Sequence, residues 1–186
     1  MIKKVSALIL ASSFFASASS NVAAQPSEGD MSLFLSNTFS ESNLAFDLLG
    51  LPAGPVYNIG YFLNDDLMAY GSLRIINHEE GTNLGLGLGA RFYQAGSGQL
   101  RTFIDGSFSY ATVEVAGIGD LGLDDDDGST DISIMSLGGF FGAEYMFSPN
   151  FSVAAKVGAT FTDYGKDADA TTLDLGAVDI MFNFYF

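Results

Sequence analysis

Alternation of apolar and polar side chains constrains the fold of this chain more than any other feature of its sequence. In the last stretch, residues 176–186, one parity carries large apolar groups and the other carries a mixed set. The apolar side chains are Val178, Ile180, Phe182, Phe184 and Phe186. Successive side chains of a β-strand point to opposite faces, so the pattern predicts a strand with one apolar face. Because about 9–11 residues of a tilted strand cross a hydrocarbon layer, this strand is long enough to span a membrane.

The same alternation recurs along the chain, and no segment carries a helical period that competes with it. Turn residues separate the segments, so consecutive strands are expected to pair in one antiparallel meander. The expected strands after the first are Val56–Leu63, Leu67–Asn77, Asn83–Tyr93, Leu100–Val115, Asp131–Phe147, Phe151–Tyr164 and the last stretch. We predict an all-β fold, an eight-stranded antiparallel up-and-down transmembrane β-barrel.

The first strand has two candidates, Met31–Thr38 and Asn43–Leu51. Counting both gives nine strands, an odd number that would leave the amino terminus outside the cell. Either one alone gives eight, and we favour Met31–Thr38. The connections also differ in length, since Asn64–Asp66, Ala95–Gln99 and Ser148–Asn150 are short whereas residues 116–130 form a long acidic loop. Bacterial barrels have tight periplasmic turns and longer outer loops, so the short turns are expected on the periplasmic side.

The amino terminus has the pattern of an export signal. Lys3 and Lys4 give a basic start, Val5–Ala18 is a short apolar run, and Val22–Ala24 offers small residues for cleavage. We predict a signal peptide over residues 1–24 and an outer-membrane β-barrel domain over residues 25–186. The apolar run is too short and too interrupted by serine for a spanning helix.

Charge and cysteine content exclude several classes of function. The formal net charge is −15, whereas a protein that binds nucleic acid needs a basic surface, so we expect no nucleic-acid partner. The chain has no cysteine, which excludes disulfides, thiolate zinc sites and a cysteine nucleophile. No cofactor is expected.

Alternation does not itself say which face of a barrel points inward, because a soluble lipocalin-like barrel buries its apolar face and a membrane barrel exposes it. Here the face opposite the apolar one is rich in glycine and serine, which suits a narrow lumen better than a water-exposed exterior. Aromatic residues also gather near strand ends, where membrane barrels carry an interfacial girdle. These residues are Tyr61, Phe62, Phe92, Tyr93, Tyr145, Phe147, Phe151, Phe184 and Phe186. We therefore predict that the apolar face contacts lipid.

Charged residues on the polar parity then point into the lumen. The predicted lumen charge network consists of the cations Arg74, Arg91, Arg101 and Lys156 and the carboxylates Asp105, Glu144 and Asp179. An eight-stranded barrel is just wide enough for side chains to fill it, and buried charges persist only when they are paired. We predict a salt-bridged polar plug in which one of the four cations pairs with Asp179. A gated ion path through the same charges is the alternative.

Two further features are candidates for chemistry, a histidine and an acidic run. His78, the only histidine, lies at the outer end of a strand, but no serine stands two residues away to act as a nucleophile beside it. The loop run Asp124, Asp125, Asp126 and Asp127 could hold a divalent cation weakly. A loop histidine without a role and a solvated acidic loop are the favoured interpretations.

The chain resembles the small bacterial outer-membrane barrels of the OmpA transmembrane-domain and OmpX kind. The resemblance rests on the export signal, the eight alternating segments, the Ser148–Asn150 turn before Phe151–Thr162, and the terminal Ile180–Phe186. Leu86–Tyr93 and the Asn64–Asp66 turn are also similar to the YfaZ-type outer-membrane proteins. No peptidoglycan-binding domain is expected after the barrel, in contrast to OmpA, so a cell-wall tether is not expected.

The resemblance implies a function and a set of binding partners for the chain. In such barrels the last strand is read by the barrel-assembly machinery, which here implicates Phe182, Phe184 and Phe186. Outer-membrane lipid and lipopolysaccharide are the other expected partners, and the partner of the outer loops stays unknown. We predict a non-enzymatic integral protein of the cell outer membrane that acts through acidic loops in surface integrity or adhesion. A narrow gated channel and a lipid-modifying barrel enzyme that uses His78 are the alternatives.

Overall fold

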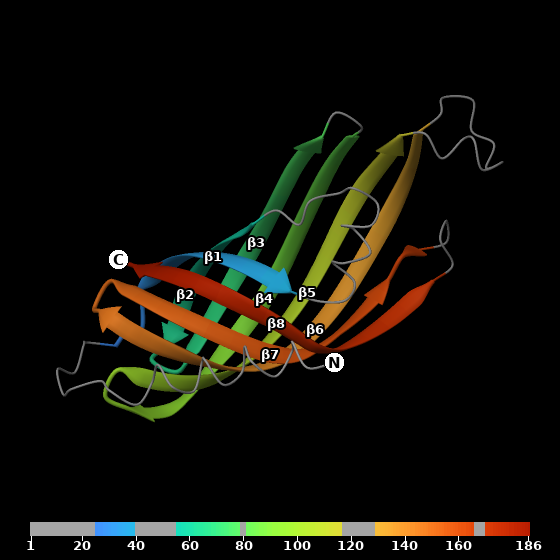
Figure 1. The fold of residues 1–186 in the computed structure, drawn as a ribbon. Coiled ribbons are helices and arrows are strands. Elements are labelled where there is room, and N and C mark those ends of the chain that lie inside the picture. Colours follow the sequence, from blue (N-terminus) through green and yellow to red (C-terminus); the bar gives the residue numbers. More distant parts are fainter. Residues whose placement is uncertain (1–24, 40–54, 79–80, 117–128, 166–169) are drawn as a thin grey trace.

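The computed structural model describes residues 25–39, 55–78, 81–116, 129–165 and 170–186 of the chain. They form one closed antiparallel barrel in which each strand pairs with the next and β1 pairs with β8 (Figure 1). The strands are β1 (Met31–Phe39), β2 (Val56–Asn64), β3 (Leu67–His78), β4 (Gly81–Ser97), β5 (Leu100–Ala116), β6 (Ser129–Ser148), β7 (Phe151–Asp163) and β8 (Thr171–Tyr185). The predicted eight-stranded barrel is confirmed.

Closure of the barrel settles which candidate is the first strand. β1 begins at Met31 and pairs with both β2 and β8, so the prediction of Met31–Thr38 is confirmed. The other candidate, Asn43–Leu51, lies outside the described residues, as does the predicted signal peptide over residues 1–24. No helix in the described part of the chain is long and apolar enough to cross a membrane.

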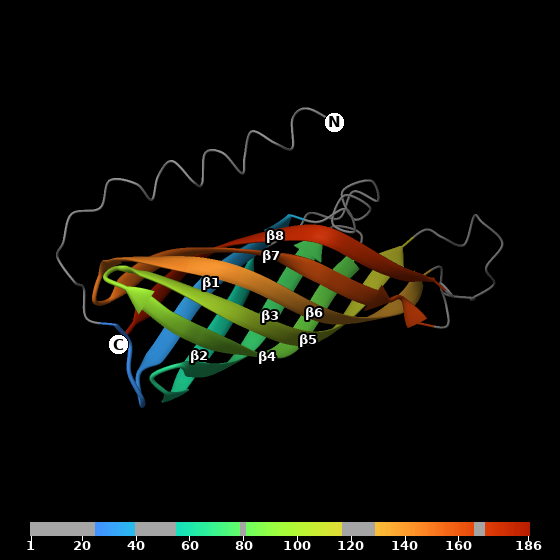
Figure 2. The same cartoon turned by 90° about the horizontal axis from the view of Figure 1, so that it is seen from below.

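The three short turns lie together at one end of the barrel, which we call the turn end (Figures 1 and 2). They join β2 to β3, β4 to β5 and β6 to β7. In the first of them the Asp66 amide donates to the Asn64 side-chain oxygen at 3.0 Å, a local bond that favours a tight turn. The start of β1 lies at the same end, because the amide of Phe62, close to the turn between β2 and β3, donates to the carbonyl of Asp30 at 3.0 Å.

The apolar face points outward, as the sequence predicted. Leucine and phenylalanine side chains on this face are among the most exposed in the chain, and Leu88 is 69% exposed. The polar parity points inward, with Arg91, Asp105 and Glu144 fully buried. The outer surface of the barrel is therefore apolar and its lumen is charged, which is the reverse of a soluble barrel.

The prediction of an aromatic girdle is wrong for two of its residues. Phe62 and Tyr93 are 0% and 1% exposed and lie inside the lumen, whereas their chain neighbours Tyr61 and Phe92 point outward. Adjacent residues of a strand must point to opposite faces, so a pair of aromatic residues at a strand end can supply only one ring to the girdle.

β8 contains a bulge that the alternation alone does not reveal. Gly158 of β7 pairs with Ala177, but the next residue, Ala159, pairs with Leu175, so Gly176 is the extra residue. Gly176 has a φ of 89°, a left-handed conformation that glycine adopts without strain. The extra residue reverses the parity before it, which is why Leu175 points outward and is 79% exposed.

Glycines on the lumen face make room for aromatic rings that lie flat across it. A Cβ atom added at Gly89 would lie 2.2 Å from the Tyr70 ring, and one at Gly142 would lie 2.3 Å from the Phe103 ring. Such distances are far inside van der Waals contact, so the glycines permit the rings to pack against the strand backbone.

Candidate functional site

The lumen is the candidate functional site, and its two halves differ. The half near the turn end is filled by large side chains that are almost completely buried, and we call this set the plug. Its members are Phe34, Phe62, Met68, Arg91, Tyr93, Arg101, Phe103, Asp105, Glu144, Met146, Met181 and Tyr185. The other half encloses a cavity of about 200 Å³, which we call the cup.

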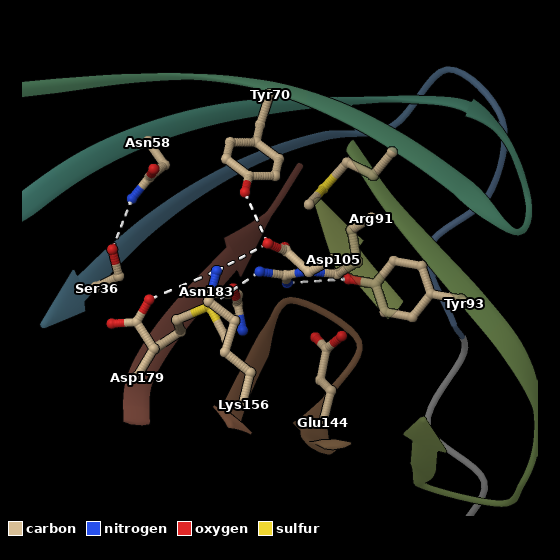
Figure 3. Close-up of polar contacts among 12 residues, drawn as sticks. Ser36, Asn58, Tyr70, Arg91, Tyr93, Asp105, Glu144, Lys156, Asp179 and Asn183 are labelled. Atoms are coloured by element: carbon tan, nitrogen blue, oxygen red, sulfur yellow. Dashed lines mark hydrogen bonds and ion pairs between the residues drawn. The ribbon is translucent and has the colours of Figure 1, made fainter. Parts of the chain in front are cut away.

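Asp105 is the centre of the hydrogen bonding in the lumen (Figure 3). Its Oδ1 accepts from Lys156 Nζ at 2.8 Å and from the Tyr70 hydroxyl at 2.9 Å. Its Oδ2 accepts from Arg91 Nε at 3.2 Å. Three strands besides β5 thus supply a donor to one fully buried carboxylate, and each donor offsets part of the cost of burying that charge.

Lys156 links Asp105 to Asp179. Its Nζ lies 3.5 Å from Asp179 Oδ2, and the two residues are direct cross-strand neighbours on β7 and β8. The ammonium group also lies 4.2 Å from the centre of the Phe140 ring. Of the four cations proposed as partners for Asp179, the structure therefore places Lys156 beside it.

Glu144 forms a second cluster nearer the turn end. Its Oε1 accepts hydrogen bonds from the hydroxyls of Ser152 and Tyr185. Arg101 Nη2 lies 3.7 Å from Glu144 Oε2, an ion pair without a hydrogen bond. Asn183 Nδ2 donates to Ser152 Oγ at 2.8 Å and extends the cluster to β8.

Aromatic rings cover both arginines of the plug. The guanidinium carbon of Arg91 lies 4.4 Å from the centre of the Phe103 ring, and that of Arg101 lies 3.9 Å from the centre of the Tyr93 ring. A guanidinium over a ring face is attracted by the ring quadrupole, and the attraction strengthens away from water. These contacts are not among the sequence predictions, although Tyr93 and Arg91 share a parity on one strand.

Arg74 stands apart from the plug. It is half-buried and lines the cup together with Asp179, whose negative charge acts on it, although no direct ion pair or hydrogen bond joins Arg74 to the residues that the structure describes. The structure thus joins Arg91, Asp105, Lys156 and Asp179 in one set of ion pairs, and it leaves Arg74 outside that set.

The remaining candidates from the sequence are a histidine and an acidic run. The His78 side chain and the run Asp124–Asp127 lie outside the described residues. Among the residues that are described, no group of three or more histidine, cysteine, aspartate or glutamate side chains could hold a metal ion.

Comparison with solved structures gives the fold. The chain matches the amino-terminal β-barrel domain of OprF from Pseudomonas aeruginosa, with a TM-score of 0.53 and 18% identity over 87% of this chain and 100% of that one. The chain has the fold of a small outer-membrane barrel. Other matches are Ail, the attachment invasion locus protein of Yersinia pestis (TM-score 0.49, 16% identity, 86% and 99% covered), and Neisserial surface protein A (0.49, 14%, 84% and 95%). No protein-family model and no curated protein matches this barrel.

Proposed function

We propose that this barrel is a non-enzymatic, non-conducting protein of the bacterial outer membrane, exported by the signal peptide over residues 1–24. It acts as an anchor that displays its outer loops, among them the acidic run Asp124–Asp127, in surface integrity or adhesion. The observation that carries the proposal is the plug. Arg91, Tyr93 and Phe103 are each at most 1% exposed in the half of the lumen near the turn end, so water does not reach these side chains.

The outer surface supports a location in lipid. Soluble monomers rarely expose contiguous apolar patches larger than a few hundred Å². Here the outward side chains of all eight strands are predominantly apolar, as Leu33, Ile59, Leu86, Leu137 and Phe182 illustrate. In water such a surface would drive aggregation, whereas in a bilayer it matches the hydrocarbon.

Single-channel recording tests the non-conducting proposal. The refolded barrel in a planar bilayer is expected to give no steady openings, because ions would have to displace the ion-paired side chains of the plug. A heat-modifiable shift on a gel, checked on the same sample, shows that the barrel is folded. Steady openings from folded protein would overturn the proposal and favour the gated channel, whose path would run from the cup past Lys156 and Asp105.

We also propose that β8 is the segment that the barrel-assembly machinery recognises, through Phe182, Phe184 and Phe186. Phe186→Ser is expected to lower the amount of folded barrel in the outer membrane several-fold, while the purified variant refolds in detergent as well as the unchanged chain does. Phe141→Ser is the matched control, because Phe141 is a similarly exposed outward ring, 52% against 67%, on β6. Equal losses in cells from both substitutions would show that lipid contact, and not recognition, explains the effect.

A further inference from the structure

The cup has walls of unusual composition. Strand register places Asn58, Ser72, Gly87, Ser109, Ser136 and Thr162 in one continuous row around the lumen, each paired with the next. All of these except the glycine carry a small hydrogen-bonding group, and all line the cup except Gly87. The described part of the cup therefore combines a ring of hydroxyl and amide groups with apolar side chains such as Val56, Leu86 and Phe108.

Arg74 lies one row further from the turn end, next to the smallest side chains of the lumen. It pairs with Gly85, which pairs with Ala111 on the next strand. A Cβ atom at Gly85 would lie 3.5 Å from both the Arg74 and Ala111 Cβ atoms, which is an ordinary van der Waals distance. Arg74, Gly85 and Ala111 all line the cup, so two positions next to Arg74 carry no long side chain into the cavity.

The charges that line the cup are unequal. Among its described residues, Arg74 and Lys156 are cationic and Asp179 is anionic. Lys156 already contacts Asp105 and Asp179 at 2.8 and 3.5 Å. The negative charge of Asp179 also acts on Arg74, but no described carboxylate forms a direct ion pair with that guanidinium group. A guanidinium group offers five donors and no acceptor, and its planar fork matches the two oxygens of a carboxylate or phosphate.

We propose that the cup binds a small soluble molecule that carries an oxyanion, with Arg74 as the ion-pairing residue and the hydroxyls of Ser72 and Ser109 as hydrogen-bond donors. The cavity, about 200 Å³, is smaller than the range of about 300–1,000 Å³ that drug-sized ligands occupy, so the occupant is limited to small solutes. The closed barrel wall separates the cup from lipid, which favours a solute over the phosphate of a lipid head group. The plug closes the cup toward the turn end, so the molecule is held there and not passed through.

Arginine side-chain signals provide a direct test. The chain contains only Arg74, Arg91 and Arg101, so protein labelled with ¹⁵N-arginine in detergent micelles gives three Nε–H resonances. Titration with inorganic phosphate, against sodium chloride at equal ionic strength, is expected to shift the Arg74 resonance saturably. Arg91 and Arg101 are buried in the plug and serve as internal controls. Absence of a saturable shift, or equal shifts of all three resonances, would overturn the proposal.

Two variants test where phosphate binds, and a measurement with phosphatidic acid tests whether the phosphate group comes from a solute or a lipid. By calorimetry, Arg74→Gln is expected to weaken phosphate binding at least about tenfold, and Ala111→Phe, which fills the free space but keeps the charge, is expected to weaken it similarly. Both variants should keep the heat-modifiable shift, because Arg74 makes no described contact that folding requires. Retained affinity in folded Arg74→Gln would contradict the proposal. So would a shift of Arg74 that appears with phosphatidic acid in nanodiscs but not with inorganic phosphate.

Discussion

Replacing Asp105 with asparagine is expected to lower the free energy of unfolding by about 3–5 kcal/mol, because it leaves buried cations without their counter-charge. The carboxylate is 0% exposed and accepts hydrogen bonds from Tyr70, Arg91 and Lys156. An asparagine amide has no charge to balance the guanidinium or the ammonium group. Urea titration in detergent micelles, followed by far-ultraviolet circular dichroism because the chain has no tryptophan, measures the loss.

The matched control is Asp66→Asn. Asp66 is an exposed aspartate in the turn between β2 and β3, so its replacement is expected to change the free energy of unfolding by no more than about 0.5 kcal/mol. A second comparison separates charge from packing. Adding Lys156→Met to Asp105→Asn removes one of the cations that lost its counter-charge, and it is expected to recover part of the stability. If the double variant is as unstable as the sum of the single ones, the Asp105–Lys156 ion pair does not stabilise the barrel.

Gly158→Ala is expected to destabilise the barrel by about 3 kcal/mol, the upper part of the range for overpacked sites. Its Cβ atom would lie 2.1 Å from the Gly139 carbonyl oxygen and 2.7 Å from the Phe140 Cα atom. Both are backbone atoms of β6, so relief requires β6 and β7 to separate close to the bulge at Gly176 of β8. The same urea titration measures the effect, together with the yield of folded protein.

Gly139→Ala supplies the control on the facing strand. A Cβ atom there meets nothing within 4 Å and points outward, so the barrel is expected to keep its stability within about 0.5 kcal/mol. Equal destabilisation by the two substitutions would mean that loss of glycine flexibility, and not the backbone clash, controls stability at these positions.

The sequence by itself determined the class of fold and the direction of its two faces. Alternation in segments such as Leu84–Phe92 predicts strands, and side chains of a strand must alternate whatever the tertiary context. The cations Arg91, Arg101 and Lys156 share a parity with glycine and serine, which predicted their inward direction, and all three are buried. Local periodicity was sufficient here because each strand repeats the same two-faced pattern.

Only the tertiary structure decided which residues meet across the lumen. Asp105 and Lys156 stand on strands that are not neighbours, and their contact depends on barrel closure, strand stagger and the length of each side chain. The bulge at Gly176 changes the register of β8, and no alternation pattern fixes where such an extra residue lies. The division of the lumen into plug and cup follows from these long-range relations. Parity states that a side chain points inward, but the partner it reaches is set by the three-dimensional register of all eight strands.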